Sequence, residues 1–600
     1  MSQDPSTPSG SPGRPSGQAG PRIGRRPLLL GGLAGGLGAA VPGIIGGAGR
    51  GSAAYALDRA LKLTASRAVS VAGTTLEQTA SPAGASGYRR LTAGPGYALV
   101  VRDELASGKS GRDDRRTALA SVVQFTDLHM VDAQSPVRFE FLHEITGSAF
   151  RPHEALGTQG AVSLVRRINQ LTRGPFSGRR FDCVVATGDN TDNHEGIELD
   201  WFLTVMSGGE ITPNTGDPDR WEGVQSAGDT LYWNPEAPVD DIYKQAGFPT
   251  IAGYFDRATT THTSPGLDVP WYSVFGNHDD SIEGTLPSSW ELVDAYTGSF
   301  KFTGFADPSS DTALKAALRS GSTTILSASE DWKLDWKVTP DERRRPFTPE
   351  EYIHRHLYAE YVGPGPVGHG FDEEAASTGR SYYTFEISPG VVGVALDSTN
   401  RAGFTDGSIG DEQWRWLKKV LADGNSTYWD EFGIKHTHDV SDTYFVLFSH
   451  HTSDTMLNLL LDPAKPLDAR HSGAQLVTLL QNYPSVLAWV NGHTHDNKLT
   501  PHSHDDPRRS FWEINTASHI DFPQQARIID VCDNRDGTLS LFTTLVESAS
   551  PYQDSYASGS QAALAALYRE LSFNDLHYDS TREGTAADHN TELLLSDPLF

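Results

Sequence analysis

Residues that could bind divalent metal ions follow five separate apolar runs in this sequence. Carboxylate, imidazole and amide groups are suitable ligands for Mn, Fe or Zn. Seven such donors exceed what one ion needs, but they would serve two ions about 3.5 to 4 Å apart if the Asp189 carboxylate is shared. Glycines directly before Asp189, Asn277 and His493 would permit the sharp turns and close backbone approach of a crowded site. The seven residues are Asp127, His129, Asp189, Asn277, His450, His493 and His495.

The elements that must position these residues are predicted to be parallel strands. From Ala118 onward, short apolar runs alternate with amphipathic stretches, a pattern typical of α/β proteins. The carboxyl ends of parallel strands meet at one edge of a sheet, so ligands that follow five of them can converge. The expected strands end at Phe125, Thr187, Phe275, Leu396, Ser449, Val490 and Thr516.

Three helices are predicted from apolar spacing and from residues that start or stop helices. Residues 161–171 carry their apolar side chains on one face and two arginines on the other. Ser408, followed three residues later by Asp411, indicates a capping box that opens a second helix. A third helix is expected over residues 474–481 and ends before a proline.

The five blocks resemble those of the calcineurin-like metallophosphoesterase superfamily. Its pattern of D-x-H, GD-x-x-(D), GNH-(D/E), H and GH-x-H is matched here in order, from Asp127 to His495. The resemblance implies an α/β fold, a four-layer α-β-β-α sandwich of two sheets flanked by helices. It also implies two groups of ligands, Asp127, His129, Asp189 and His495 for the first ion, and Asp189, Asn277, His450 and His493 for the second.

The function that this resemblance implies is a binuclear-metal phosphoesterase acting on phosphomonoesters or phosphodiesters. Two divalent ions would convert a shared water to hydroxide near neutral pH and neutralise charge on the phosphate. His278 matches the superfamily's general acid, with Asp279 placed to orient it. Asp192 stands where purple acid phosphatases carry tyrosine, so a ferric site is not expected; Asp192 and Asp279 could also cap turns. The alternative is a non-catalytic cell-envelope binding protein that keeps the fold and a structural metal.

Other histidines compete with these candidate ligands. His451 could face the metals in place of His450, and the resemblance favours His450 because the superfamily's ligand directly follows the strand. Two further H-x-H pairs follow no apolar strand with a glycine exit and are expected in solvated loops. These pairs are His436 with His438 and His502 with His504.

The composition excludes several classes of protein. With 76 acidic and 49 basic residues among 600, the formal net charge of −27 argues against nucleic-acid or anionic-lipid binding through general electrostatics. The two cysteines, Cys183 and Cys532, cannot build a disulfide framework or a cysteine-based metal site. Any metal must therefore use His, Asp, Glu or Asn.

The N-terminal residues are typical of an export signal. Arg25 and Arg26 precede a glycine-rich apolar stretch and then Ala54-Tyr55-Ala56, the order that a secretory signal needs. The paired arginines resemble a twin-arginine signal, which implies the cell envelope, the periplasm or the extracellular space. An uncleaved anchor is the alternative, although glycines and a proline weaken a transmembrane helix there. We expect no membrane-spanning segment in the mature chain.

Changes in pattern divide the chain into four parts. Residues 1–56 form the signal region, and 57–117 an irregular extension with one hairpin around Tyr97 to Val101. The metallophosphoesterase domain spans 118–547, and 548–600 holds one helix, Gln561 to Leu571, and a polar acidic tail. Insertions over 193–270 and 282–380 interrupt the domain and are expected to cover the site. Four aromatic residues of the first insertion are expected to pack its small core, Trp221, Tyr232, Trp233 and Tyr254.

Overall fold

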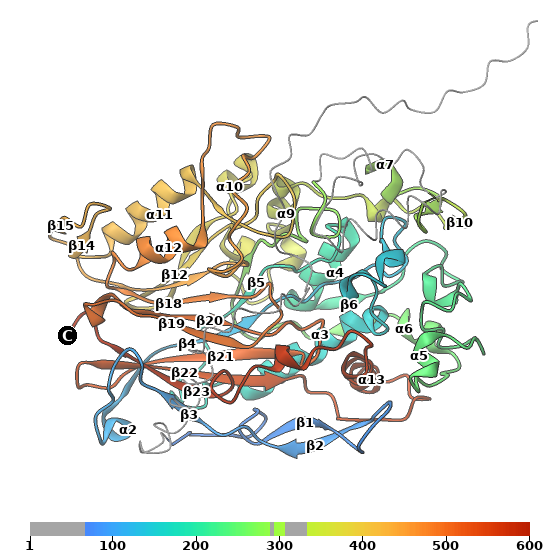
Figure 1. Cartoon of the computed structure of the whole chain (residues 1–600), viewed down its shortest axis with the longest axis horizontal. Coiled ribbons are helices and arrows are strands. Elements are labelled where there is room, and N and C mark those ends of the chain that lie inside the picture. The colour runs from blue at the N-terminus through green and yellow to red at the C-terminus, as the bar shows by residue number, and fades with distance from the viewer. Residues whose placement is uncertain (1–66, 288–292, 306–332) are drawn as a thin grey trace, which may run out of the picture. The chain divides into compact units, whose positions relative to one another are not determined.

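A seven-stranded sheet carries the first three candidate ligand loops. We describe the computed structural model over residues 67–287, 293–305 and 333–600 (Figure 1). In spatial order the strands are β3 (Val100–Arg102), β23 (Thr591–Ser596), β22 (Thr538–Glu547), β21 (Gln525–Asp533), β4 (Thr117–Phe125), β5 (Cys183–Thr187) and β8 (Trp271–Val274). Strands β4, β5 and β8 are parallel neighbours, as the sequence predicts. Strand β4 also pairs antiparallel with β21, so the sheet is mixed.

A six-stranded sheet carries the other two candidate ligand loops. In spatial order its strands are β11 (Tyr383–Ser388), β12 (Val391–Ala395), β16 (Tyr444–Phe448), β18 (Val486–Asn491), β20 (Phe511–Asn515) and β19 (Lys498–His502). The four central strands, β12, β16, β18 and β20, run parallel. All seven expected strand ends lie at or within one residue of an observed strand end, so this prediction is confirmed.

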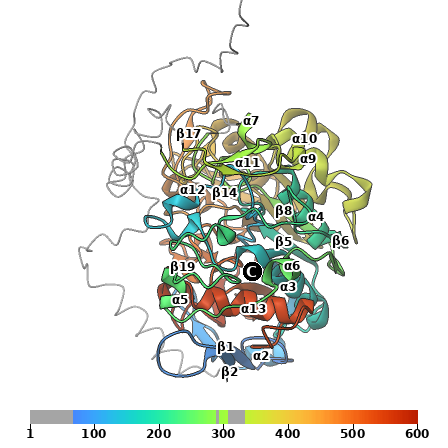
Figure 2. The same cartoon turned by 90° about the vertical axis from the view of Figure 1, so that its right-hand side faces the viewer.

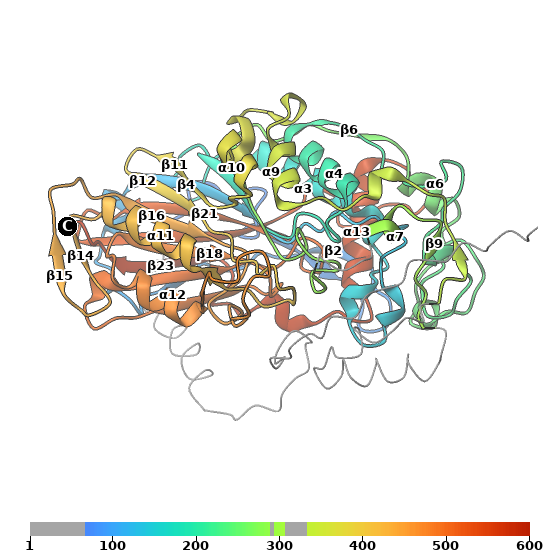
Figure 3. The same ribbon diagram turned by 90° about the horizontal axis from the view of Figure 1, so that it is seen from above.

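The six-stranded sheet is buried on both faces. In β16, Phe445 and Leu447 pack with helices α11 (Asp411–Asp423) and α12 (Gly473–Leu480), which lie over this sheet (Figure 3). The alternate residues Val446 and Phe448 belong to a second cluster that includes side chains from both sheets. This alternation is the period of two that strands impose, and it explains why these runs are almost wholly apolar.

Helices α3 (Gly157–Leu171) and α13 (Gln561–Phe573) confirm two predicted helices and lie side by side (Figure 2). Their close approach requires Gly160, because a Cβ there would lie 2.4 Å from the Tyr568 ring. The apolar face of α3 belongs to the core shared by both sheets. Helix α4 (Gly196–Ser207) also contributes to that core, although the sequence assigns it to the first insertion.

One predicted helix start is wrong and one is unforeseen. Helix α11 forms as expected, but its N-cap is Gly410, without a side-chain hydrogen bond. Ser408 is not a cap, because its hydroxyl accepts a hydrogen bond from Arg470 Nε at 2.9 Å. A full capping box instead opens α12, where Ser472 and Gln475 satisfy each other's backbone N–H groups.

The N-terminal extension and the C-terminal end differ from their predictions. The hairpin lies at β1 (Gln78–Pro82) and β2 (Leu91–Pro95), whereas residues 100–102 join the large sheet as β3. The expected polar tail contains β23, which lies between β22 and β3. Leu593, Leu594 and Leu595 are buried in this strand, and the charge of the buried Glu592 is paired with Arg112, Oε2 to Nη2 at 2.7 Å.

The remaining elements are short. The aromatic residues of the first insertion do pack into a cluster, with Trp233 and Tyr254 fully buried, but the expectation of a core of its own is wrong because residues 131–156 and helix α13 share this cluster. None of the helices within the described ranges combines the length and apolar character needed to traverse a bilayer. The expected signal region lies outside the described residues. The other elements are α2 (Arg112–Arg115), β6 (Gly209–Ile211), α5 (Ile242–Gln245), α6 (Tyr254–Ala258), β7 (His262–Ser264), α7 (Val293–Tyr296), β9 (Phe300–Lys301), β10 (Trp336–Lys337), α9 (Pro349–His356), α10 (Glu373–Thr378), β13 (Ile409–Gly410), β14 (Thr427–Trp429), β15 (Lys435–Thr437) and β17 (Arg470–His471).

Candidate metal centre

The candidate ligands follow the carboxyl ends of five parallel strands, three in one sheet and two in the other. Asp127 and His129 follow β4, Asp189 follows β5, Asn277 follows β8, His450 follows β16, and His493 and His495 follow β18. The two sheets meet at these ends, because Gln124 Nε2 of β4 donates to the carbonyl of Asn491 in β18 at 2.8 Å. Chain segments far apart in the sequence thereby converge on one centre.

Six of the seven candidate residues form overlapping clusters of metal-binding atoms. Donor atoms of Asp127, His129 and His495 lie within 4.8 Å of one another. Those of Asp127, Asp189 and His450 form a second such group. His450 Nε2 lies 3.0 Å from Asp189 Oδ2, and His495 Nε2 lies 3.3 Å from Asp127 Oδ1. Asp189 therefore contacts ligands from both sheets.

His493 and Asn277 complete the set. His493 Nδ1 lies 3.2 Å from His450 Nε2, and these two residues share a third cluster with His451. The Asn277 amide donates to the Gly284 carbonyl at 3.0 Å, which leaves its buried Oδ1 without a hydrogen-bond partner. His129 Nε2 is likewise buried without such a partner. Buried polar atoms normally have partners, so a cation would satisfy both.

The backbone at the ligands is strained. Asp127, His129, Asp189, His493 and His495 all have positive φ, between 43° and 71°. Non-glycine residues rarely adopt this conformation, and where they do they cluster at functional sites. Five of the seven candidate ligands share this conformation. It is a second indication, separate from the donor clusters, that these loops form a functional site.

The glycines before the ligands are required by close contacts, as the sequence predicts. A Cβ on Gly276 would lie 2.2 Å from Asp189 Oδ1, and one on Gly492 would lie 2.4 Å from Asp127 Oδ2. At Gly188 a Cβ would lie 2.7 Å from His450 Nδ1. Any side chain at these positions would displace a candidate ligand.

Burial and mutual charge shift the pKa values of the ligands. Burial lowers the pKa of His450, but the Asp189 carboxylate more than offsets this and raises it to about 9. Burial likewise opposes the charge of His495, yet Asp127 raises its pKa to about 8. Burial and the neighbouring His450 lower the pKa of His493 well below its usual value. The carboxylates that raise these two pKa values carry the negative charge that a bound cation would neutralise.

His278 belongs to a further cluster of donor atoms, with His129 and Asp192, but Asp279 does not orient its ring. His278 Nδ1 lies 2.5 Å from the carbonyl oxygen of Asp192, and its half-buried ring lies 4.6 Å from that of His129, between centroids. The Asp279 carboxylate instead accepts hydrogen bonds from the backbone N–H groups of Thr191 at 2.9 Å and Gly276 at 3.0 Å. The expected orienting contact is therefore wrong, because these N–H groups, left unpaired where strands end, occupy the carboxylate.

Two carboxylates that contact ligand histidines complete the centre. Asp192 Oδ1 lies 3.0 Å from His129 Nδ1, which gives this residue a contact that the sequence left open. Asp521 Oδ2 lies 2.7 Å from His495 Nδ1, a role that the sequence did not assign. The only signal for Asp521 in the sequence is its position shortly after the last ligand block.

The competing histidines lie outside this arrangement or are already paired. His451 has both ring nitrogens engaged, Nδ1 at 2.8 Å from Ser398 Oγ and Nε2 at 2.8 Å from the Thr405 carbonyl. Neither of the further H-x-H pairs belongs to a metal-binding cluster in the described part of the chain. His436 contacts Asp430 and His502 contacts Glu513. These two histidines lie in strands β15 and β19, so the expected loop position is wrong for them.

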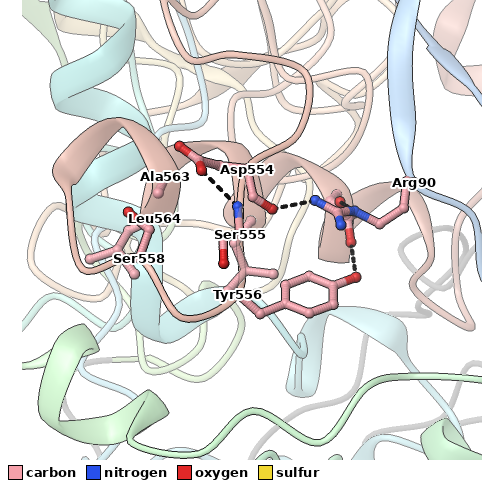
Figure 4. Close-up of a pocket in the computed structure, with 9 residues that line it drawn as sticks. Arg90, Asp554, Ser555, Tyr556, Ser558, Ala563 and Leu564 are labelled. Atoms are coloured by element: carbon pink, nitrogen blue, oxygen red, sulfur yellow. Dashed lines mark hydrogen bonds and ion pairs between the residues drawn. The ribbon is translucent and has the colours of Figure 1, made fainter.

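A small pocket is lined by Arg90 and by residues between 554 and 570 (Figure 4). Its polar groups already have partners, since Arg90 Nη2 donates to the Asp554 carbonyl and Arg90 Nε to Glu570, both at 2.5 Å. None of the residues that line it is a candidate ligand or catalytic residue. We assign it no part in the chemistry.

Comparisons with known proteins add little to this geometry. No family model matches the sequence, and no curated protein matches it. A dimetal phosphatase from Danio rerio is similar at a TM-score of 0.30 and 11% identity, over 72% of this chain and 99% of that one. The anchor in the inner membrane complex of Plasmodium is similar at a TM-score of 0.24 and 10% identity, over 75% and 95%. At these TM-scores the likenesses carry no argument, so any function must be argued from the site itself.

Proposed function

We propose that this chain is a binuclear metal-dependent phosphoesterase that hydrolyses phosphomonoesters or phosphodiesters. One observation carries the proposal: six of the seven candidate ligands form overlapping clusters of donor atoms, and two atoms of the candidate set, His129 Nε2 and Asn277 Oδ1, are buried without hydrogen-bond partners. Neutral imidazole, carboxylate and amide groups fit Mn, Fe(II) or Zn. The donor set exceeds what one ion can use.

The proposed ligands divide between two ions, with Asp189 shared. Asp127, His129 and His495 would complete the first ion's set. Asn277, His450 and His493 would complete the second. When bound, two divalent ions supply an activated water and neutralise negative charge on the phosphate.

His450, not His451, is the proposed ligand of the second ion. His451 already contacts a hydroxyl and a carbonyl through its two ring nitrogens. His450 uses Nδ1 on the Thr187 carbonyl at 3.0 Å, which directs Nε2 toward Asp189. That division of nitrogens is typical of a histidine that binds a metal.

The chain's own contribution to bond breaking is the proton that His278 supplies to the leaving alkoxide. Its Nδ1 donates to the Asp192 carbonyl, which fixes the ring and leaves Nε2 to carry the transferred proton. The backbone N–H of His278 donates to Asp189 Oδ1 at 2.9 Å, which ties the acid to the shared ligand. Asp279 contributes indirectly, because it holds the backbone after β5.

The proposal includes the fold and the organisation of the chain. We take the two sheets, with α11 and α12 on one side and α3 and α4 on the other, as a four-layer α-β-β-α sandwich, supported by the two clusters that bury the sheets. Helix α4 would belong to the sandwich itself, so the first insertion would be the part of 193–270 that follows α4, and 282–380 would be the second. Arg25 and Arg26, with the apolar stretch after them, support export by the twin-arginine route.

Turnover of p-nitrophenyl phosphate and bis-p-nitrophenyl phosphate with added Mn²⁺ tests this function. We expect His278→Ala to lower kcat by about 10²–10⁴-fold, the usual contribution of a general acid, with unchanged Mn²⁺ content. His504→Ala, which removes a histidine outside the clusters, should leave both unchanged. Bound metal without turnover of either ester would favour a binding protein, and loss of metal from His278→Ala would contradict the assigned roles.

A further inference from the structure

The two histidines proposed for the first ion are both held by carboxylates. His129 Nδ1 lies 3.0 Å from Asp192 Oδ1, and His495 Nδ1 lies 2.7 Å from Asp521 Oδ2. Such contacts fix the tautomer and the orientation of a ligand histidine and increase its basicity. Each ring is thereby held with Nε2 available to an ion.

Both carboxylates are contacted by arginines of one short segment, residues 138–154. Arg151 meets Asp521 with two nitrogens, Nε at 2.7 Å from Oδ1 and Nη2 at 3.3 Å from Oδ2. The same guanidinium places Nη1 3.9 Å from Asp192 Oδ1. Arg138 Nη1 donates to the other oxygen of Asp192. One segment therefore holds the supports of two histidines that lie far apart in the sequence.

The arginines of this segment are themselves rigidly held. Arg138 and Arg151 are 1% and 2% exposed. Glu154 accepts from Arg138 Nη2 at 2.8 Å and from the backbone N–H of Arg151 at 2.9 Å. The Ser148 carbonyl accepts from both guanidinium groups, at 3.3 and 3.2 Å. Planar, fully charged guanidinium groups in such a setting fix the direction of a carboxylate well.

The ligands proposed for the second ion have supports of a different kind. His450 Nδ1 contacts a backbone carbonyl, that of Thr187, at 3.0 Å. The Asn277 amide donates to another, that of Gly284, at 3.0 Å. Both of these supports are neutral backbone carbonyls, whereas the first ion's histidines are held by carboxylates, so the two halves of the centre are held asymmetrically.

We propose that Arg151 is a positioning residue for the first ion, acting through Asp521 on His495 and, more weakly, through Asp192 on His129. The inference rests on the proposed function, because it takes the ligand sets from there. Removing the Arg151 guanidinium takes away the buried two-nitrogen contact that orients Asp521, so His495 is held less firmly. The second ion's ligands keep their contacts, so the effect is confined to one of the two sites.

Arg582 offers an internal comparison on the same carboxylate. Its Nη1 lies 2.5 Å from Asp521 Oδ2, the oxygen that contacts His495. Its side chain is 30% exposed, so solvent screens this contact, whereas the Arg151 contact is buried. Arg582→Gln should therefore affect metal binding less than Arg151→Gln.

Mn²⁺ binding to the purified full chain, by equilibrium dialysis and elemental analysis, tests the proposal without an activity assay. We expect two sites in the wild type, and in Arg151→Gln one site weakened by about 10–100-fold, the usual effect of losing such a support. The other site should stay within about twofold. Arg151→Lys keeps the charge but not the paired contact, so it should recover part of the lost affinity. If Arg151→Gln does not fold, Arg151→Lys replaces it as the test variant.

The route through Asp521 is tested by combining variants. Asp521→Asn should weaken the same site, and Arg151→Gln added to it should weaken that site little further, because the two side chains act as one unit. Arg112→Gln is the control, since Arg112 forms an equally buried pair with Glu592 outside the centre. It should lower stability and leave Mn²⁺ affinity unchanged.

The outcomes separate this inference from the proposed function. Fewer than two Mn²⁺ per wild-type chain would overturn the proposed function and this inference together. Two ions in the wild type, with Mn²⁺ binding unchanged in Arg151→Gln, weakened equally at both sites, or weakened equally by Arg112→Gln, would overturn this inference alone.

Discussion

Single residues at the candidate centre adopt conformations that only their neighbours make stable. Residues with positive φ, such as Asp127 and Asp189, each cost about 1–3 kcal/mol unless the surroundings hold them. Asp127 accepts a hydrogen bond from the backbone of His493 at 3.1 Å, and Asp189 accepts one from the backbone of His278 at 2.9 Å. The ligand loops therefore hold one another, and a change at one should affect the next.

Gly284 is a residue-scale test of this crowding. A Cβ there would lie 2.4 Å from His278 Nε2 and 2.7 Å from Asn277 Nδ2, at a φ of +60°. We predict that Gly284→Ala lowers kcat by about 10²-fold or more, because it displaces the proposed general acid. Steady-state kinetics with p-nitrophenyl phosphate measures this change.

Gly390 provides the matched control for Gly284. Its φ is +84°, but a Cβ there would meet nothing within 4 Å. Gly390→Ala should therefore cost only backbone strain, roughly 1–2 kcal/mol of unfolding free energy, and leave kcat unchanged. Equal kcat values for the two variants would show that the space beside His278 is not limiting.

Among the elements, helix α9 connects an expected insertion to the site. Tyr352 Oη accepts from Asn190 Nδ2 at 2.9 Å and lies 2.7 Å from Ser273 Oγ. Asn190 belongs to the loop that carries Asp189, and Ser273 belongs to β8. The stretch 282–380 thus contacts the loop after β5, the loop that carries Asp189.

His356 of α9 predicts how stability depends on pH. It is buried with Nε2 unpaired, and burial lowers its pKa from 6.5 to about 3. The unfolded chain therefore binds more protons than the folded chain below about pH 6.5, so stability falls as the pH drops through this window. Between pH 7.5 and 5, we predict that His356→Gln loses about 2 kcal/mol less unfolding free energy than the wild type does.

Urea unfolding of the EDTA-treated protein at both pH values measures this difference. His354→Gln is the control, because His354 is exposed on the same helix. It should leave the wild-type pH dependence intact. If His356→Gln and the wild type lose equal stability on acidification, the buried histidine is not a source of the acid sensitivity.

At the scale of the whole molecule, the last strand of the chain, β23, lies inside the large sheet between β22 and β3. Strand β23 pairs antiparallel with β22 and parallel with β3, so it joins residues near both ends of the described chain. Leu593, Leu594 and Leu595 are all at most 1% exposed. Each buried leucine contributes about 2 kcal/mol, and the three together approach the total stability of an ordinary domain.

Removing residues 591–600 should therefore abolish cooperative folding. Thermal unfolding followed by circular dichroism and limited proteolysis would show a broad, low-temperature transition and rapid digestion. Removing only residues 598–600 is the control, since this truncation keeps β23 and Phe600 is 83% exposed. A sharp, unshifted transition in the longer deletion would mean that β23 is dispensable.

The sequence by itself determined those features that depend on residues close together in the chain. Apolar runs of strand length set the strand ends to within a residue, and the ordered blocks after them selected the residues that cluster. The glycines before Asp189, Asn277 and His493 were also readable, because chain reversal next to a ligand needs them. Period and composition act over a few residues, so a single sequence displays them.

The tertiary structure alone decided which partners these residues meet. Asp521 contacts Arg151 across 370 positions of the chain, and Asp279 binds backbone N–H groups in place of His278. The core strand at the acidic end buries Glu592, whose charge is paired with Arg112 from a distant segment of the chain. Such contacts depend on which segments the fold brings together, and burial makes them strong; no local pattern encodes either property.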